Sequence, residues 1–186
     1  MSGTIRLRRT PGGFGTVAEP SLRVSGVQLV GAAGGADLDG RTPAEVAGEV
    51  GVTVNSLADV DSGGSGVSPD ETLYVDAAAA AVVAEALAVG HEALAAFAPG
   101  VTAVLWPEHF DLSIPLDAVN YGVSPGDDHI PEPYAYVGPW DVSTLSGAFW
   151  NTSFGAARPL TQLTDVRSFF EEGRTLSAHA DHHGLG

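Results

Sequence analysis

The chain has 186 residues, no cysteine and no lysine, and its 23 acidic residues outnumber eight arginines to give a formal net charge of -15. A chain of this length can bury a sizeable core as one domain, and the lack of cysteine excludes disulfides and thiolate metal ligands. The negative charge disfavours nucleic acid and anionic membrane as partners, because both carry phosphate groups.

Local patterns in the first part of the chain predict two strands followed by a helix. Apolar and charged residues alternate over 4–10, and an interrupted apolar run covers 22–30. Thr42 then has the character of a helix N-cap, Pro43 suits the first helical position, and Glu45 completes a capping box. A hairpin-like pair of strands and a short helix are therefore expected here.

Two motif spacings overlap or follow this helix, and simpler interpretations are favoured for both. Residues 42–60 have helix-turn-helix spacing, but 52–60 contains no arginine to neutralise phosphates and carries Asp59. Residues 59–70 have EF-hand-like carboxylate spacing, but Gly63 stands at the fifth position, where a calcium ligand belongs. We therefore expect a helix with a turn and then a flexible Gly/Ser linker.

A long apolar helix is predicted from Ala77 to Phe97, ended by Pro99-Gly100. The run is mostly alanine and is broken by Glu85, and the opening residues of the chain lack the apolar core of a signal peptide, so a cytoplasmic protein is expected. One apolar stripe that can lie across a sheet is formed by Val83, Leu87, Gly90, Leu94 and Phe97.

The strongest structural prediction is a β-hairpin built from 109–114 and 119–124. Both segments alternate in polarity, and closing the hairpin on the four residues between them pairs Ile114 with Val119 and matches every further pair. One face then carries Phe110, Leu112, Ile114, Val119, Tyr121 and Val123, and the other carries His109, Asp111, Ser113, Asn120, Gly122 and Ser124.

The segments after this hairpin predict a turn, a third strand and a closing helix. Residues 124–127 have the composition of a type II turn with Gly126 at positive φ, 134–137 alternates as a strand, and 165–177 has helical spacing. The sequence therefore predicts an α+β fold, with an antiparallel sheet packed on one long helix and a short closing helix. We expect a single domain over 1–177, with an aromatic-rich strand region at 101–157 and a disordered tail at 178–186.

A divalent metal site is one hypothesis for the polar face of the hairpin. In the predicted register the turn after the second strand folds over the start of the first, and two histidines with clustered carboxylates suit zinc, manganese or iron. The simpler alternative is a solvated polar face beside an acidic turn. The candidate ligands are His109, Asp111, Asp127, Asp128 and His129.

A binding surface made of aromatic rings is a second hypothesis for the same region. Such rings can stack on a sugar or heterocycle or anchor a partner protein, although rings on alternating strands also commonly fill the core beneath a helix. The candidates are Trp106, Tyr134, Tyr136 and Trp140, with Trp150 further along the chain.

The phrases LWPEHFDLSI, VNYGVSPGD, PEPYAYVGPW and FWNTSFGAARPL, with FFEEGR after them, resemble uncharacterised actinobacterial proteins of similar length. The resemblance covers most of the chain. It implies a cytoplasmic actinobacterial setting, and it implies no activity, ligand or catalytic residue.

Taken together, these patterns favour a small soluble binding or interaction protein, with its site on the 109–136 face and a small molecule or a protein as partner. The alternative is a metal-dependent hydrolase that uses His109, Asp111 and His129 around a divalent ion. Nucleic acid and membrane are not expected as partners.

Overall fold

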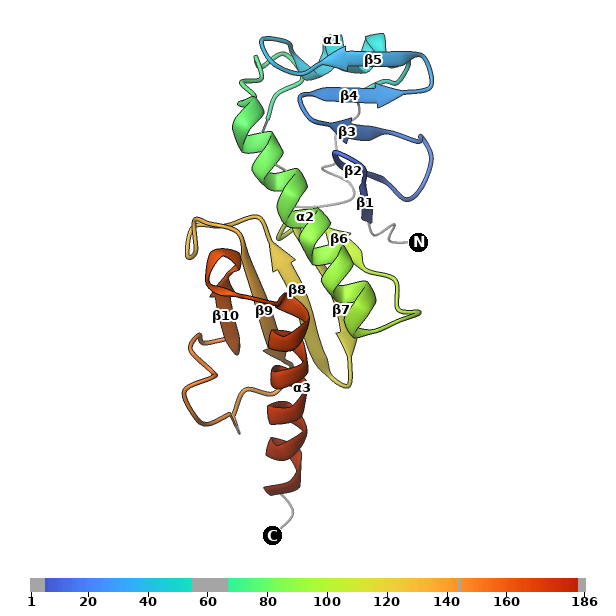
Figure 1. Ribbon diagram of the computed structural model, residues 1–186. Helices are drawn as coiled ribbons and strands as arrows, with labels where there is room; N and C mark the ends of the chain where they lie inside the picture. The colour runs from blue at the N-terminus through green and yellow to red at the C-terminus, as the bar shows by residue number, and fades with distance from the viewer. Residues whose placement is uncertain (1–5, 55–66, 144, 184–186) are drawn as a thin grey trace. The chain divides into compact units, whose positions relative to one another are not determined.

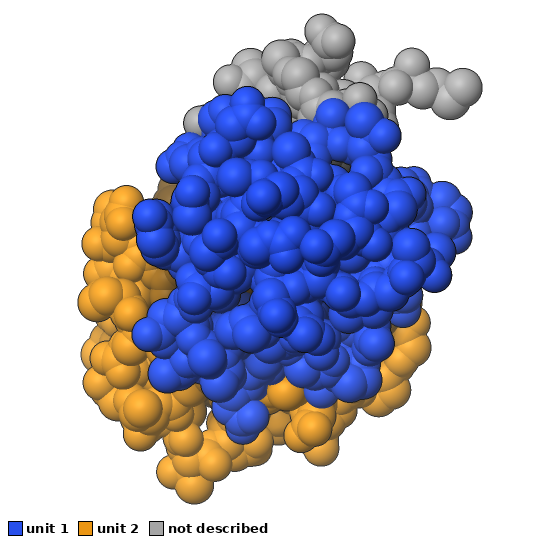
Figure 2. Space-filling view, turned by 90° about the horizontal axis from the view of Figure 1, so that it is seen from above, with its two compact units in different colours: residues 1–85, 106–108 blue, residues 86–105, 109–186 orange. Residues whose placement is uncertain are grey.

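A computed structural model describes residues 6–54, 67–143 and 145–183, and it divides into two compact units. Unit 1 comprises residues 1–85 and 106–108, and unit 2 comprises residues 86–105 and 109–186, as coloured in Figure 2. The described residues are mixed α and antiparallel β, which confirms the predicted α+β class.

Unit 1 contains a meander of five short antiparallel strands, each paired with the next along the chain (Figure 1). The apolar run predicted as one strand at 22–30 is a hairpin, because Gly26 has φ +57° and Ser25 pairs with Gln28. The strands are β1 (Leu7–Thr10), β2 (Gly13–Thr16), β3 (Arg23–Ser25), β4 (Gln28–Gly31) and β5 (Gly34–Asp37).

The helix predicted after this meander is α1 (Pro43–Glu49), and its capping box is present as the sequence indicated. The Thr42 side chain accepts the Glu45 backbone N–H, and the Glu45 carboxylate accepts the Thr42 backbone N–H. Most of the second half of the disfavoured helix-turn-helix spacing, and most of the EF-hand-like loop, fall in residues 55–66, which lie outside the described residues.

The predicted long helix is α2 (Ala77–Phe97), with the same bounds in the structure. Asp76 caps it by accepting the Ala79 backbone N–H at 2.8 Å. In the described part of the chain it is the one helix with the length and apolar composition to cross a membrane. In the part of α2 that belongs to unit 2, Leu87, Gly90 and Leu94 are buried, as is typical of a helix in a protein core.

Unit 2 is built on a sheet in which β7, β8, β9 and β10 are antiparallel neighbours. No strand was predicted from the sequence at β10, and the last helix continues into the residues predicted to form a disordered tail. The remaining elements are β6 (Val104–Trp106), β7 (Asp111–Leu116), β8 (Val119–Ser124), β9 (Tyr134–Pro139), β10 (Ala156–Pro159), the 3₁₀ helix η1 (Leu160–Gln162) and α3 (Val166–His183).

The β7–β8 hairpin closes on two residues, Asp117 and Ala118, which have φ of 52° and 58°. Positive φ at both central residues is typical of a type I′ turn, whose twist matches that of the strands. Leu116 therefore pairs with Val119, and Ile114 pairs with Tyr121 rather than with Val119 as predicted. The register is shifted by two residues, so the faces assigned to residues 111–114 and 119–124 from the sequence are unchanged.

The apolar face of β7–β9 is covered by α2 and α3. A Cβ atom built on Gly90 of α2 would lie 2.8 Å from Val123, and one on Gly173 of α3 would lie 2.8 Å from Val137. Both helices therefore approach the sheet closely. Rings from three elements meet in the core, since Phe97 lies 4.7 Å from Tyr121 and 5.5 Å from Phe170 between ring centroids.

Candidate functional site

Much of the predicted polar face of the hairpin is buried rather than solvated, although His109 and Asn120 are exposed. Asp111, Ser113 and Ser124 are all buried, and the Tyr136 hydroxyl donates a hydrogen bond to the Asp111 carboxylate. The Tyr136 ring lies over Gly122, where a Cβ atom would come within 2.6 Å of it. Glycine at that position is what lets the ring close over the carboxylate.

Burial has a direct electrostatic consequence for the two tyrosines of this face. Burial and then the charge of Asp111 raise the pKa of Tyr136 far above the usual range. Burial and a 2.6 Å hydrogen bond to Asp127 raise the pKa of Tyr134 to about 12. Both hydroxyls are therefore neutral donors near neutral pH, and each is already held by a carboxylate.

The five residues proposed as metal ligands do not gather into one site. His109, Asp128 and His129 are exposed. The carboxylate of Asp127 accepts the backbone N–H of His129 and of Ile130, both at 2.8 Å, in addition to the Tyr134 hydroxyl. Among the described residues no three histidine or acidic side chains form a group that could hold a metal ion.

The physical reason is the register of the hairpin. The metal hypothesis placed His109 on the first strand, opposite the end of the second. In the structure β7 begins at Asp111, after Phe110 turns the chain with φ 51°, so His109 precedes the strand. The two-residue shift brings Asp111, and not His109, level with the end of β8, beneath Tyr136.

The four proposed binding rings also differ in environment. Trp106 belongs to unit 1, where the Arg6 guanidinium lies 5.8 Å from its ring centroid. Tyr134 and Tyr136 belong to the buried polar face. Trp140 is 68% exposed, and its indole N–H donates to Asn120 at 3.2 Å, which orients the ring at the end of β9. Of the four, Trp140 alone presents most of its surface to solvent.

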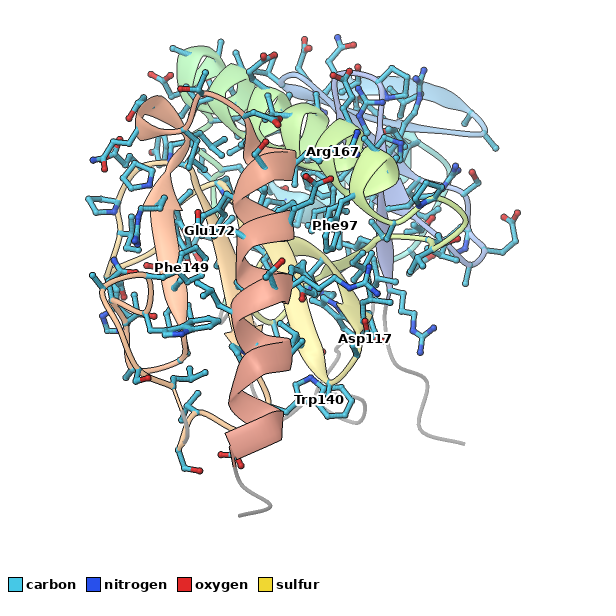
Figure 3. The ribbon with its side chains drawn as sticks, turned by 60° about the horizontal axis from the view of Figure 1, so that its bottom comes forward. Phe97, Asp117, Trp140, Phe149, Arg167 and Glu172 are labelled. Carbon is cyan, nitrogen blue, oxygen red and sulfur yellow. The ribbon has the colours of Figure 1, made fainter. Side chains whose placement is uncertain are left out.

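A cavity of about 310 Å³ lies on the other side of the same hairpin, in unit 2. We call it the hairpin pocket. It is formed by the β7–β8 turn, by the end of β9 with the loop after it, and by the second half of α3; Figure 3 labels Asp117 at the turn. Its lining residues are Asp117, Ala118, Val119, Tyr121, Pro139, Asp141, Leu145, Arg174, Ser177 and Ala178.

An ion pair joins two sides of the hairpin pocket. Arg174 on α3 donates to one oxygen of Asp117 on the turn, from Nη2 at 2.7 Å and from Nε at 3.1 Å. Both side chains are about half exposed, at 50% and 60%. The second Asp117 oxygen and the Nη1 group of Arg174 make no hydrogen bond with the described residues, so the pair keeps acceptor and donor capacity beyond itself.

Tyr121 is among the residues that line the hairpin pocket, and its buried hydroxyl makes no hydrogen bond within the described structure. Burial raises the pKa of this hydroxyl to about 12, an effect that Arg174 opposes and Asp117 reinforces. Arg174 and Asp117 line the same cavity as Tyr121.

The hydroxyl of Tyr121 is the feature that sequence reasoning missed. The alternation of residues placed Tyr121 on the apolar face, where it does lie. The sequence does hold one signal for this hydroxyl. Position 121 on the apolar face carries a tyrosine, although phenylalanine would fill nearly the same core volume without a polar group. Recognising it requires knowing that no partner surrounds the hydroxyl, and only the packing of α3 on the hairpin reveals that.

Comparisons of the chain with protein-family models, with curated proteins and with solved structures return no match. The argument for function therefore rests on the chemistry of these residues.

Proposed function

We propose that this protein is a binding domain for a small molecule and that the hairpin pocket is its site. The observation that carries the proposal is the hydroxyl of Tyr121, a residue that is 0% exposed, for which the described part of the chain offers no hydrogen-bond partner. A buried hydroxyl without a partner costs about 1–3 kcal/mol, and a ligand atom that hydrogen-bonds to it removes that cost.

The surroundings of the hydroxyl support the same function. A volume of about 310 Å³ is at the small end of the range for small-molecule sites, which combine apolar walls with a few polar groups. Val119, Pro139 and Leu145 supply apolar lining, while Arg174 and Asp117 supply the polar groups. The binding role follows the hypothesis drawn from the sequence, in the same hairpin but on its opposite face.

The metal-dependent hydrolase has no comparable support, because the proposed ligands are dispersed or already occupied among the described residues. We also propose a cytoplasmic setting. The burial of Leu87, Gly90 and Leu94 of α2 in unit 2 supports a core role for this apolar helix.

A pocket-filling variant tests the proposal. Ala178 lines the hairpin pocket on α3, so Ala178→Phe places a ring in the cavity. Ala78, an exposed alanine of α2, gives the matched control Ala78→Phe. The full chain and both variants are screened by ¹⁹F NMR against one mixture of fluorinated aromatic fragments.

We expect fragments that bind the parent and Ala78→Phe to lose binding to Ala178→Phe. Fragment binding that survives in Ala178→Phe, or no binding to any of the three proteins, would overturn the hairpin pocket as the site.

A further inference from the structure

We infer that the hairpin pocket takes an uncharged molecule with an amide-like group, in which an N–H donor adjoins a C=O acceptor, on a small apolar ring. This inference rests on the proposed function and adds the chemical class of the ligand. Its basis is the arrangement of donor groups on Arg174, acceptor oxygens on Asp117 and Asp141, and one buried hydroxyl around a partly apolar cavity.

The charges around the cavity disfavour an ionic ligand. Arg174 and Asp117 neutralise each other through contacts at 2.7 and 3.1 Å, so the pair offers no net charge to an incoming ion. Asp141 also lines the cavity, and the chain carries a net charge of -15. An anion therefore meets net repulsion, whereas a cation, which offers donors only, leaves the Arg174 guanidinium without an acceptor.

The hydrogen-bonding groups match an amide. The Nη1 group of Arg174 is a donor and the second oxygen of Asp117 is an acceptor, and neither is used by a described residue. An amide presents a carbonyl oxygen to the first and an N–H to the second without introducing charge. The Tyr121 hydroxyl can donate to the same carbonyl oxygen, which has two lone pairs.

The apolar side chains that line the cavity indicate that the ligand carries an apolar ring. Val119 and Pro139 are paired across β8 and β9, and Leu145 faces the same cavity. A ring placed against these side chains is removed from contact with water. This burial of apolar surface is the main source of favourable binding free energy for so small a molecule. A cavity of about 310 Å³ accommodates one such ring with its polar substituent.

Because Tyr121 is 0% exposed, a ligand reaches its hydroxyl only when neighbouring side chains move. The whole Tyr121 residue is closed to solvent, although it is among the residues that border the cavity. Arg174 and Asp117 beside it are 50% and 60% exposed. Exposed ion pairs of this kind contribute little to stability, so the pair can open and close again around a ligand at small cost.

Three probes of similar size test the inference: benzamide, benzoate and benzylamine share one benzene ring and differ in charge, and the first two also share one planar shape. Each is titrated into the ¹⁵N-labelled full chain while the amide signals of residues 117–121 and 174–178 are followed. We expect benzamide to bind with a dissociation constant of about 1–10 mM, and each charged probe to bind at least about threefold more weakly.

Four variants connect the binding to the named groups. Tyr121→Phe should weaken benzamide binding about 2- to 12-fold, the effect of losing one hydrogen bond. Tyr74→Phe, which changes a tyrosine that is 87% exposed, should leave it unaltered. Arg174→Met should weaken it as well, whereas Arg167→Met, which breaks an exposed ion pair on the same helix, should not.

The outcomes separate the two proposals. If benzoate or benzylamine binds more tightly than benzamide and depends on Tyr121, the pocket is a binding site and the inferred ligand class is wrong. If no probe shifts residues 117–121, or if benzamide binds Tyr121→Phe as tightly as the parent, the hairpin pocket and the ligand class both fail.

Discussion

Two tyrosines on adjacent strands of one sheet show how differently the two faces of that sheet are built. Tyr136 pairs with Gly122 and points to the polar face, and Tyr121 pairs with Val137 and points to the helices. The Tyr136 hydroxyl is held by the Asp111 carboxylate, while the Tyr121 hydroxyl makes no hydrogen bond in the described structure. Burial raises the pKa of both hydroxyls.

The two hydroxyls therefore differ in role: that of Tyr136 stabilises the folded protein, and that of Tyr121 is available to bind a ligand. The hydrogen bond of Tyr136 is satisfied inside the protein, so removing it must cost stability. The hydroxyl of Tyr121 gives the folded protein no such bond, so removing it costs the fold nothing. A polar group that is buried without contributing to stability, and that adjoins a cavity, is the better guide to function.

The largest expected effect belongs to Tyr136→Phe. The change leaves the buried Asp111 carboxylate without its donor, and we expect the free energy of unfolding to fall by about 2–3 kcal/mol. Tyr134→Phe is the matched control, because its partner Asp127 is exposed and water can replace the lost donor. Urea denaturation near neutral pH measures both, and equal losses would contradict the contrast between buried and exposed carboxylates.

Local signals and strand alternation were enough to predict much of this fold. The capping box of Thr42 and Glu45 and the helix from Ala77 to Phe97 depend on neighbours in sequence, and both are present. The alternation of polar and apolar residues was enough to assign the two faces of β7 and β8. It was not enough to predict the register of the two strands, because nothing in the sequence indicates that Ala118 adopts positive φ.

The candidate site was less predictable because its geometry is long-range. The metal hypothesis depended on the register and failed to gain support when the register shifted by two residues. The hairpin pocket depends on α3 packing against a turn 57 residues earlier, where Arg174 meets Asp117. No local pattern encodes that contact, and the unpaired state of the Tyr121 hydroxyl follows only from it.

The next expected effect is a loss of folding stability at high pH. Tyr121, Tyr134 and Tyr136 have pKa values raised on folding, to about 12 for the first two and higher for the third. Above pH 10 the unfolded chain loses protons that the folded chain retains, so stability present below that pH is lost as the pH rises. Each tyrosine contributes up to about 1.4 kcal/mol per pH unit.

Urea denaturation at several pH values between 10 and 11.5 measures this slope. Tyr121→Phe removes one of the three groups and should flatten the slope by about one third, if the three hydroxyls contribute alike. An unchanged slope in Tyr121→Phe would mean that its hydroxyl is not buried in the folded protein.

The smallest expected effect, and the most informative one, is that of Tyr121→Phe on stability at neutral pH. Phenylalanine keeps the ring contacts with Phe97 and Phe170 and removes only the unpaired hydroxyl. The free energy of unfolding should therefore stay the same or rise by up to about 1 kcal/mol, since a buried unpaired hydroxyl is a cost. Thermal unfolding of Tyr121→Phe beside Tyr136→Phe makes the comparison within one sheet. A loss of about 1 kcal/mol or more in Tyr121→Phe would mean that its hydroxyl is bonded in the folded protein, and the case for a ligand at that position would then fall.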